Sequence, residues 1–275
     1  MKGTTASAFG QLRWALTDKF ELSGGVRYTC EKRRATLNQL YVNPFLLAAF
    51  GLLPAGQSQG GQTVSSNRSP ELTASYKPTK DSLIYVAYKT GFKSGGVSTA
   101  SFITANQTGS APDCANPAST KICLLFRPET SKGFEFGAKS FLANRTLRLE
   151  FSAYTYLFSD LQVSTFNQAT NSFYLANAAS ARIKGAELQL EWLPIARLRL
   201  TGAVAYNSAK YVKYPTGSCY VGQTTGCVGG VQDLERTHAP ACAEAQSGIR
   251  RELRCRCGAR PQGRSEREHD VHVEL

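Results

Sequence analysis

The protein has 275 residues, of which 19% are charged and 10% are aromatic, and its formal net charge is +12. Met1 is the only methionine, whereas Gly, Tyr and Phe are plentiful. This mixture disfavours a helical protein and suits strands. No stretch approaches the roughly 18 consecutive apolar residues of a transmembrane helix. Any span of a membrane therefore requires strands that form a barrel.

Eight segments alternate apolar and polar residues with a period of two, which predicts strands with one apolar and one polar face. In residues 20–29, for example, Phe20 and Val26 share one face, whereas Glu21 and Arg27 share the other. Most segments are near the roughly 9–11 residues that cross a bilayer at a tilt. In chain order they are 11–16, 20–29, 71–76, 82–88, 134–141, 146–157, 187–192 and 197–206.

Short and long connections alternate strictly between these predicted strands. The short ones are 17–19, 77–81, 143–145 and 193–196, and the long ones are approximately 31–67, 92–127, 158–179 and 212 onward. Structureless loops longer than about 15 residues are uncommon in compact soluble domains. Outer-membrane barrels combine short periplasmic turns with long extracellular loops. The connections therefore favour an antiparallel transmembrane β-barrel over a soluble antiparallel sheet, in which strands alternate in the same way.

Two pairs among the eight cysteines are close in sequence and lie in predicted loops. Cys114 and Cys123 form one pair, and Cys219 and Cys227 form the other. Either pair can close a small loop as a disulfide, which fits an oxidising compartment outside the cytoplasm. A zinc site needs closer cysteine spacing or nearby histidines, and both loops lack them. The sequence therefore predicts disulfides and no metal site.

Three blocks of sequence resemble the barrel of TonB-dependent receptors. The first carries a Gly-Phe-Lys-x-Gly-Gly stretch, the second opens on Pro-Glu-Thr and reaches Asp-Leu-Gln, and the third contains Lys-Gly-x-Glu. In order, they are SPELTASYKPTKDSLIYVAYKTGFKSGGVS (69–98), RPETSKGFEFGAKSFLANRTLRLEFSAYTYLFSDLQVSTF (127–166) and NAASARIKGAELQLEW (177–192). They cover residues 69 to about 211 almost continuously and follow the order found in the family.

The resemblance implies about eight strands of a 22-stranded barrel in the outer membrane of a Gram-negative bacterium. Such receptors bind ferric siderophores, or sometimes other nutrients, at their outer surface. TonB then contacts a short N-terminal box and moves a plug that closes the barrel. External loops and the plug hold the ligand, so Lys93, Phe102 and Arg127 are weak candidates for ligand contacts. No cofactor is implied.

Departures from the family mark both ends of the chain. We expect the signal peptide, plug and TonB box to be missing before residue 1, so the receptor barrel is expected to be truncated. Residues 1–234 are assigned to the barrel. Residues 235–275 contain no Phe, Tyr or Trp, and we interpret them as an out-of-frame tail, with a disordered or metal-binding tail as rivals.

Other functional classes fit the sequence less well. The basic residues are scattered and no nucleic-acid-binding motif accompanies them, so nucleic acid is not an expected partner. No GxSxG, HExxH or phosphate loop is present, and all three histidines lie in the tail, so an enzyme is not expected. A small outer-membrane barrel with an adhesin or structural role, and a non-functional product of a decayed gene, remain as alternatives to the receptor.

Overall fold

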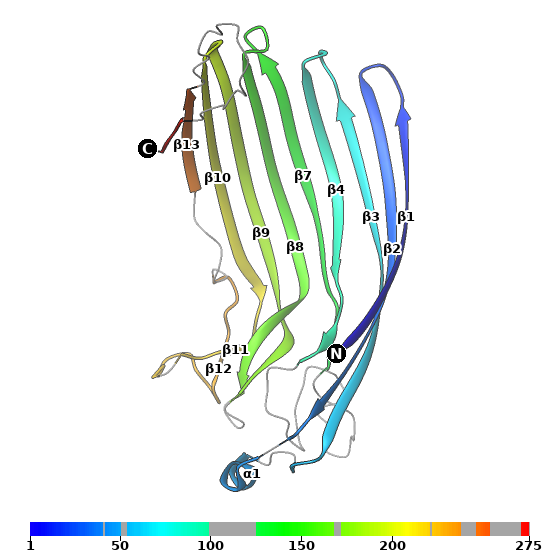
Figure 1. Ribbon diagram of the computed structural model, residues 1–275, viewed down its shortest axis with the longest axis vertical. Helices are drawn as coiled ribbons and strands as arrows, with labels where there is room; N and C mark the ends of the chain where they lie inside the picture. Colours follow the sequence, from blue (N-terminus) through cyan, green and yellow to red (C-terminus); the bar gives the residue numbers. More distant parts are fainter. Residues whose placement is uncertain are drawn as a thin grey trace, which may run out of the picture.

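One antiparallel sheet dominates the computed structural model, which describes residues 1–40, 42–50, 54–98, 125–167, 172–220, 222–237, 246–253 and 271–274. Each strand pairs with its sequence neighbour in the order β1-β2-β3-β4-β7-β8-β9-β10-β13-β14. Figure 1 shows them as a curved wall with β1 near one edge and β13 near the other. The long strands are β1 (Lys2–Ala15), β2 (Phe20–Asn38), β3 (Ser58–Tyr76), β4 (Ser82–Lys93), β7 (Glu129–Leu142), β8 (Leu147–Asn167), β9 (Ser172–Ile195) and β10 (Leu198–Lys213).

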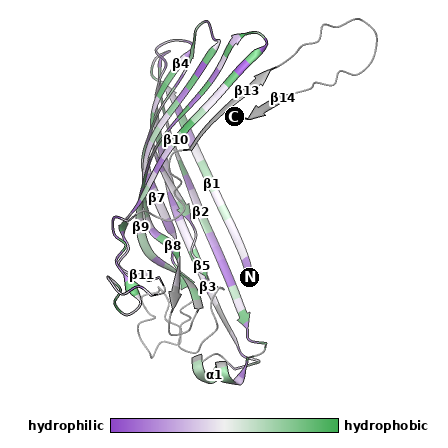
Figure 2. Ribbon diagram, turned by 90° about the vertical axis from the view of Figure 1, so that its left-hand side faces the viewer, coloured by the Kyte–Doolittle hydropathy of each residue, from purple (hydrophilic) through white to green (hydrophobic). Residues whose placement is uncertain are grey.

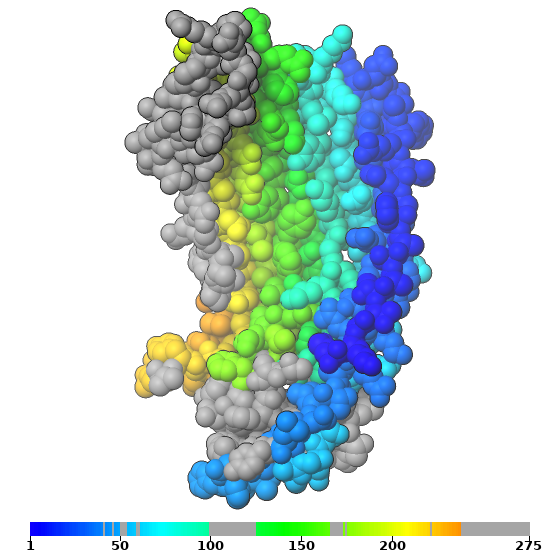
Figure 3. Space-filling view, viewed as in Figure 1, coloured from blue at the N-terminus to red at the C-terminus, as the bar shows by residue number. Residues whose placement is uncertain are grey.

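These eight long strands correspond one to one to the eight predicted from alternation, which confirms the all-β antiparallel fold. Within the described residues no pairing joins β1 to β14, so the wall is not closed into a barrel. Figure 3 shows the strands packed side by side, from blue β1 and β2 to yellow β10.

Two adjacent rows of paired residues show why the wall suits a membrane. The first row crosses eight strands as Trp14, Leu22, Ala74, Val86, Phe136, Ala153, Ala186 and Tyr206. The next row, one residue along each strand, is Arg13, Ser23, Thr73, Ala87, Glu135, Tyr154, Gly185 and Asn207. One face is therefore apolar and the other largely polar, as in barrels with lipid outside and a polar lumen. Hydrophobic and hydrophilic segments alternate along the strands in Figure 2.

Two of the predicted long loops are largely strands, and this part of the prediction is wrong. β2 continues to Asn38 and pairs with β3 from Ser58, so the connection shrinks from 31–67 to 39–57. β8 and β9 likewise continue to Asn167 and from Ser172, where a connection of 158–179 was expected. Beyond the apolar band both faces of a strand meet polar surroundings, so period-two alternation fades while the backbone ladder persists. β4 ends at Lys93 and β7 begins at Glu129, and residues 99–124 of the connection between them, which was expected as a long loop at 92–127, lie outside the described part.

The short connections are held by local hydrogen bonds. The Thr17 hydroxyl accepts bonds from the amides of Lys19 (3.2 Å) and Phe20 (3.0 Å). The turn between β7 and β8 consists of Ala143, Asn144 and Arg145, which have positive φ angles of 51°, 55° and 67°. Asparagine tolerates this conformation better than most residues. These turns, with the turn after Tyr76, lie at the same end of the wall (Figure 1).

The opposite end carries smaller elements that the sequence did not predict. They are the seven-residue helix α1 (Pro44–Phe50) and the paired segments β5 (Gly96–Val97) with β6 (Leu125–Phe126) and β11 (Gly217–Ser218) with β12 (Val231–Gln232). Among the described residues, no helix has both the length and the apolar character needed to cross a bilayer.

Buried side chains gather at this long-loop end. One cluster consists of Ala179, Ala181, Tyr211 and Tyr214, with Leu234 packed against it. A second pairs Ala35 of β2 with Val97 of β5. The core therefore lies where the long connections fold back on the wall.

Part of the tail also joins the sheet. β13 (Gln246–Leu253) pairs with residues 198–205 of β10, and β14 (Val271–Glu274) pairs with β13. The boundary placed at residue 234 and the out-of-frame origin of the tail remain predictions.

Candidate functional site

The inner face of the wall carries a hydrogen-bonded group of four side chains, which we call the inner-wall cluster. It comprises Tyr85 and Lys89 of β4, Glu135 of β7 and Tyr156 of β8. Glu135 accepts bonds from the Tyr85 hydroxyl at 2.5 Å, the Lys89 ammonium at 2.8 Å and the Tyr156 hydroxyl at 3.4 Å. The cluster presents phenol rings and one balanced charge pair to the interior of the wall.

Glycines make room for the tyrosine rings of this face. A Cβ placed on Gly137 would lie 2.2 Å from the Tyr85 ring, and one on Gly133 would lie 2.5 Å from the Tyr156 ring. Gly185 stands in the same relation to Tyr154, with the Tyr154 hydroxyl 2.5 Å from the position of a Cβ. The rings therefore lie against bare backbone on the neighbouring strand, where no larger residue fits.

A chain of ion pairs crosses the inner face nearer the short turns. Lys139 of β7 lies 3.0 Å from Glu150 of β8, which also pairs with Arg148 of the same strand. Arg148 reaches Glu191 of β9 at 3.9 Å, and Glu191 meets Arg199 of β10 at 3.3 Å. Three positive and two negative charges thus alternate over four strands, and a net positive charge faces inward.

A second network, which we call the loop anchor, ties both ends of the long β4–β7 loop to β8 and β9. Asn177 of β9 accepts a bond from the Arg127 amide at 2.6 Å and donates to the carbonyls of Arg127 and Asp160 at 2.9 and 2.8 Å. Gln162 of β8 donates to the carbonyls of Ser94 and Arg127 at 3.0 and 3.1 Å.

Local backbone geometry of β8 positions the loop anchor. Asp160 has a positive φ of 54°, and the pairing of β8 with β9 shifts register between Phe158 and Leu161. This irregularity resembles a β-bulge, which re-aims side chains at strand ends. It places the Asp160 carboxylate 2.6 Å from the Arg127 guanidinium.

The predicted ligand residues fall in three different situations. Arg127 is held in the loop anchor by Asp160, although its side chain remains 52% exposed. Lys93 starts the same loop and is freer, at 3.8 Å from Glu129 with 63% of its side chain exposed. Phe102 lies outside the described residues. The anchor therefore joins the neighbourhoods of Lys93 and Arg127, while nothing described connects them to Phe102.

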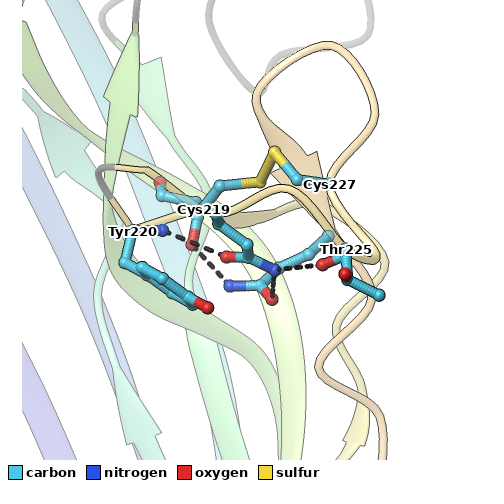
Figure 4. Close-up of a disulfide and its surroundings, with 7 residues drawn as sticks. Cys219, Tyr220, Thr225 and Cys227 are labelled. Carbon is cyan, nitrogen blue, oxygen red and sulfur yellow. Dashed lines mark hydrogen bonds between the residues drawn. A yellow bond between two sulfur atoms is a disulfide. The ribbon is translucent and has the colours of Figure 1, made fainter.

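The two predicted disulfides also differ in what the structure describes. Cys219 and Cys227 are joined, with their Cα atoms 6.1 Å apart, and the bridge closes the β11–β12 hairpin (Figure 4). Within that hairpin, the Gln223 amide donates to the carbonyl of Thr225 at 3.0 Å and to the Gln232 side chain at 2.8 Å. Cys114 and Cys123 lie outside the described residues. The described residues contain no group of three or more potential metal ligands.

Sequence reasoning missed Glu135, Asp160, Gln162 and Asn177 as organising residues. A signal was available, because Asp160 and Gln162 lie in the Asp-Leu-Gln stretch and Asn177 opens the third block that resembles TonB-dependent receptors. The tyrosine–glycine contacts had no such signal, because they depend on register between strands.

Comparison with known proteins covers most of the chain. The sequence profile of the family described as TonB dependent receptor-like, beta-barrel matches residues 1–226. The chain is 28% identical over 188 residues to the pesticin receptors of Yersinia enterocolitica and Yersinia pestis. That alignment covers 68% of this chain and 23% of the relatives, so the chain spans about a quarter of their length.

Solved structures share the fold. The ferric yersiniabactin uptake receptor FyuA of Yersinia pestis aligns over 92% of this chain and 32% of its own, with a TM-score of 0.62 and 18% identity. The siderophore receptor PiuA of Acinetobacter baumannii aligns over 91% of this chain and 31% of its own, with a TM-score of 0.61 and 15% identity. This chain therefore belongs to the TonB-dependent receptor-like β-barrel family, whose members are receptors and transporters of the Gram-negative outer membrane.

Proposed function

We propose that this chain forms part of the wall of a receptor that takes up ferric siderophores across the outer membrane with energy supplied through TonB. The observation that carries the proposal is the loop anchor. It holds both ends of the β4–β7 connection against β8 and β9. The inward face of the same wall is lined with phenols and charged groups, along which an anionic iron chelate would pass. The names of the similar proteins, a ferric yersiniabactin uptake receptor and a siderophore receptor, support the same class of cargo.

Of the two candidate ligand residues that the structure describes, Lys93 is better placed than Arg127 to contact a ligand. Its ammonium is exposed and only distantly paired, so it remains available to an anionic ligand at little cost. The Arg127 guanidinium already pairs with the Asp160 carboxylate, and the Arg127 backbone amide and carbonyl bond to the Asn177 side chain. Arg127 is therefore assigned to the position of the loop, and Lys93 to contact with the ligand.

Uptake of labelled ferric siderophores by cells that produce the receptor containing this chain tests the proposal. We expect accumulation of iron that disappears in cells without TonB. Lys93→Gln is expected to weaken ligand binding about fivefold, the effect of losing roughly 1 kcal/mol from one charge contact. Lys80→Gln is the matched control, because Lys80 is exposed in a short turn at the opposite end of the wall.

Each result bears on a different part of the proposal. TonB-independent accumulation, or none with any siderophore in a panel of catecholates, hydroxamates and phenolates, would contradict uptake. Such a result would favour the small structural barrel or a non-functional product. Unchanged binding in Lys93→Gln would remove Lys93 alone and leave the receptor assignment intact.

A further inference from the structure

Two tyrosine side chains of the inner-wall cluster approach Glu135 from opposite sides. Gly133 and Gly137 lie two residues before and after Glu135 on β7, so all three share the inner face. Tyr156 of β8 is the direct partner of Gly133, and Tyr85 of β4 is the direct partner of Gly137. Each ring lies over its glycine, and the Tyr156 and Tyr85 hydroxyls reach the Glu135 carboxylate at 3.4 and 2.5 Å. Three oxygen-bearing side chains from three strands therefore converge at one point of the wall.

Lys89 is able to leave Glu135 without leaving the inner face. Its ammonium lies 2.8 Å from the Glu135 carboxylate, and its direct cross-strand partner is Glu71 of β3. Direct partners hold their Cβ atoms about 4.5–5.5 Å apart, which is within the reach of a lysine side chain. The Lys89 side chain is 43% exposed, so packing does not prevent its movement. A cation that displaces the ammonium from Glu135 therefore leaves it beside a second carboxylate.

The chemistry of the three oxygen groups favours a small cation of high charge. Carboxylate and phenolate are hard, anionic ligands, and tyrosine phenolate holds iron in some haem proteins. A phenol ordinarily loses its proton at about pH 10, so at neutral pH the cation itself must displace that proton. Calcium and magnesium bind carboxylates, carbonyls and water, whereas ferric ion is charged enough to take phenolates. The described residues hold no metal-binding group of three His, Cys, Asp or Glu side chains, so a metal site among them has to include phenols.

We propose that the inner-wall cluster binds ferric ion through the Tyr85 and Tyr156 phenolates and the Glu135 carboxylate. Binding releases the two phenolic protons to water and moves the Lys89 ammonium to Glu71, while oxygens of water or of a weak chelator complete the coordination. Before binding, two carboxylates and one ammonium leave one negative charge on these five side chains. Ferric ion adds three positive charges and the lost protons remove two, so the bound site is neutral.

Titration of the purified full chain in detergent micelles with ferric nitrilotriacetate tests the proposal. Phenolate bound to ferric ion gives a charge-transfer absorption in the visible range, which a carboxylate alone does not give. The absorption is expected to saturate at one ferric ion per chain. Tyr85→Phe/Tyr156→Phe is expected to abolish it and to weaken iron binding at least about 100-fold, since loss of even an outer-shell partner weakens a metal site about 10- to 100-fold.

The matched control is Tyr28→Phe/Tyr206→Phe. It removes the same two hydroxyl groups from the outer face of the wall, where these side chains are 47% and 56% exposed. The absorption and the affinity of this control are expected to equal those of the parent.

Three results would overturn the proposal. They are a parent without the charge-transfer absorption, an absorption that survives in Tyr85→Phe/Tyr156→Phe, and an equal loss in the control. Where circular dichroism shows that the tyrosine variant does not fold, Lys89→Gln decides. It removes the charge that competes with the metal, so it is expected to bind ferric ion roughly fivefold more tightly or better, the effect of one like charge nearby in water. Unchanged or weaker binding would then reject the site.

The titration requires neither TonB nor a siderophore. Its failure would leave the proposed uptake standing, and failed uptake in cells would leave the ferric site standing.

Discussion

Glu135 and Gly137 illustrate how single residues build the inner face. Glu135 gathers three donors from two neighbouring strands, and Gly137, two residues further along β7, lets the Tyr85 ring lie flat enough to reach it. A charged acceptor with several donors stabilises more than an ordinary hydrogen bond. The absence of a side chain at Gly137 is therefore as important to the cluster as the carboxylate itself.

Gly137→Ala is expected to destabilise the protein by about 1–3 kcal/mol, the usual cost of overpacking a filled site. The new methyl group would stand 2.2 Å from the Tyr85 ring and force it away from Glu135. The free energy of unfolding in urea, with the chain in detergent micelles, measures the effect. Gly202→Ala is the control, because a Cβ on Gly202 meets nothing within 4 Å.

The double variant Gly137→Ala/Tyr85→Ala isolates the cause. If the ring clash is responsible, the alanine at residue 137 costs much less once the ring is gone. A cost that persists without Tyr85 would contradict the close-packing explanation.

At the scale of elements, the loop anchor brings together the three sequence blocks that resembled the family. Ser94 comes from the first block, Arg127 and Gln162 from the second, and Asn177 from the third. These residues together hold the two ends of the β4–β7 connection, which gives a physical reason for the resemblance of the three blocks to the family sequence. Neither the bulge at Asp160 nor the contacts themselves follow from residue order, because they require the register of β8 against β9.

Asn177→Ala removes three hydrogen bonds from the anchor. Hydrogen exchange at the Arg127 amide is expected to accelerate roughly 10- to 100-fold, because each of the lost hydrogen bonds contributes about 0.5–1.5 kcal/mol to local protection. Asn38→Ala at the end of β2 serves as the control. Unchanged exchange at Arg127 would show that the loop is held without Asn177.

The strand count was predictable from alternation because each spanning strand separates lipid from a polar interior. Strand lengths were not predictable, because alternation of apolar and polar residues stops where both faces of a strand are polar. The strands β2, β3, β8 and β9 continue through such regions. Helix α1 escaped prediction for another reason. Seven residues, PFLLAAF, are too short to show a helical period.

The β11–β12 hairpin carries its own prediction. In non-reducing peptide maps Cys219 and Cys227 are expected to appear in one linked product, while Cys30, a free thiol in the structure, is alkylated. Closing a loop of eight residues stabilises by about 2.5 kcal/mol in the chain-entropy description, so Cys227→Ser should expose the hairpin to proteolysis. The same map tests the predicted Cys114–Cys123 bridge, and alkylation of both would reject it.

At the scale of the whole molecule, the wall divides two environments along its entire width. Rows of apolar residues face lipid, and the adjacent rows face the interior, across eight strands without interruption. Inside, Glu135, Glu150 and Glu191 lie beside basic partners, whereas Lys132, Arg182, Lys184 and Lys210 on the outer face form no ion pair with a described residue. This asymmetry follows from register alone, since a slip of one residue would exchange the two faces.

The tail supplies the test at this scale. We propose that residues 1–234 form the structural unit and that residues 235–275 contribute little to it. Leu234, the last residue of that unit, already packs on the Tyr211 cluster. A chain ending at Leu234 should therefore keep its strand content and its unfolding midpoint, losing the short segments β13 and β14 and the hydrogen bonds of Arg236 and Thr237 with Tyr211. Circular dichroism and urea unfolding of both chains in the same micelles measure this.

A large drop in stability, or association of the shortened chain through the bared edge of β10, would instead make β13 part of the wall, because an unpaired strand edge invites further pairing.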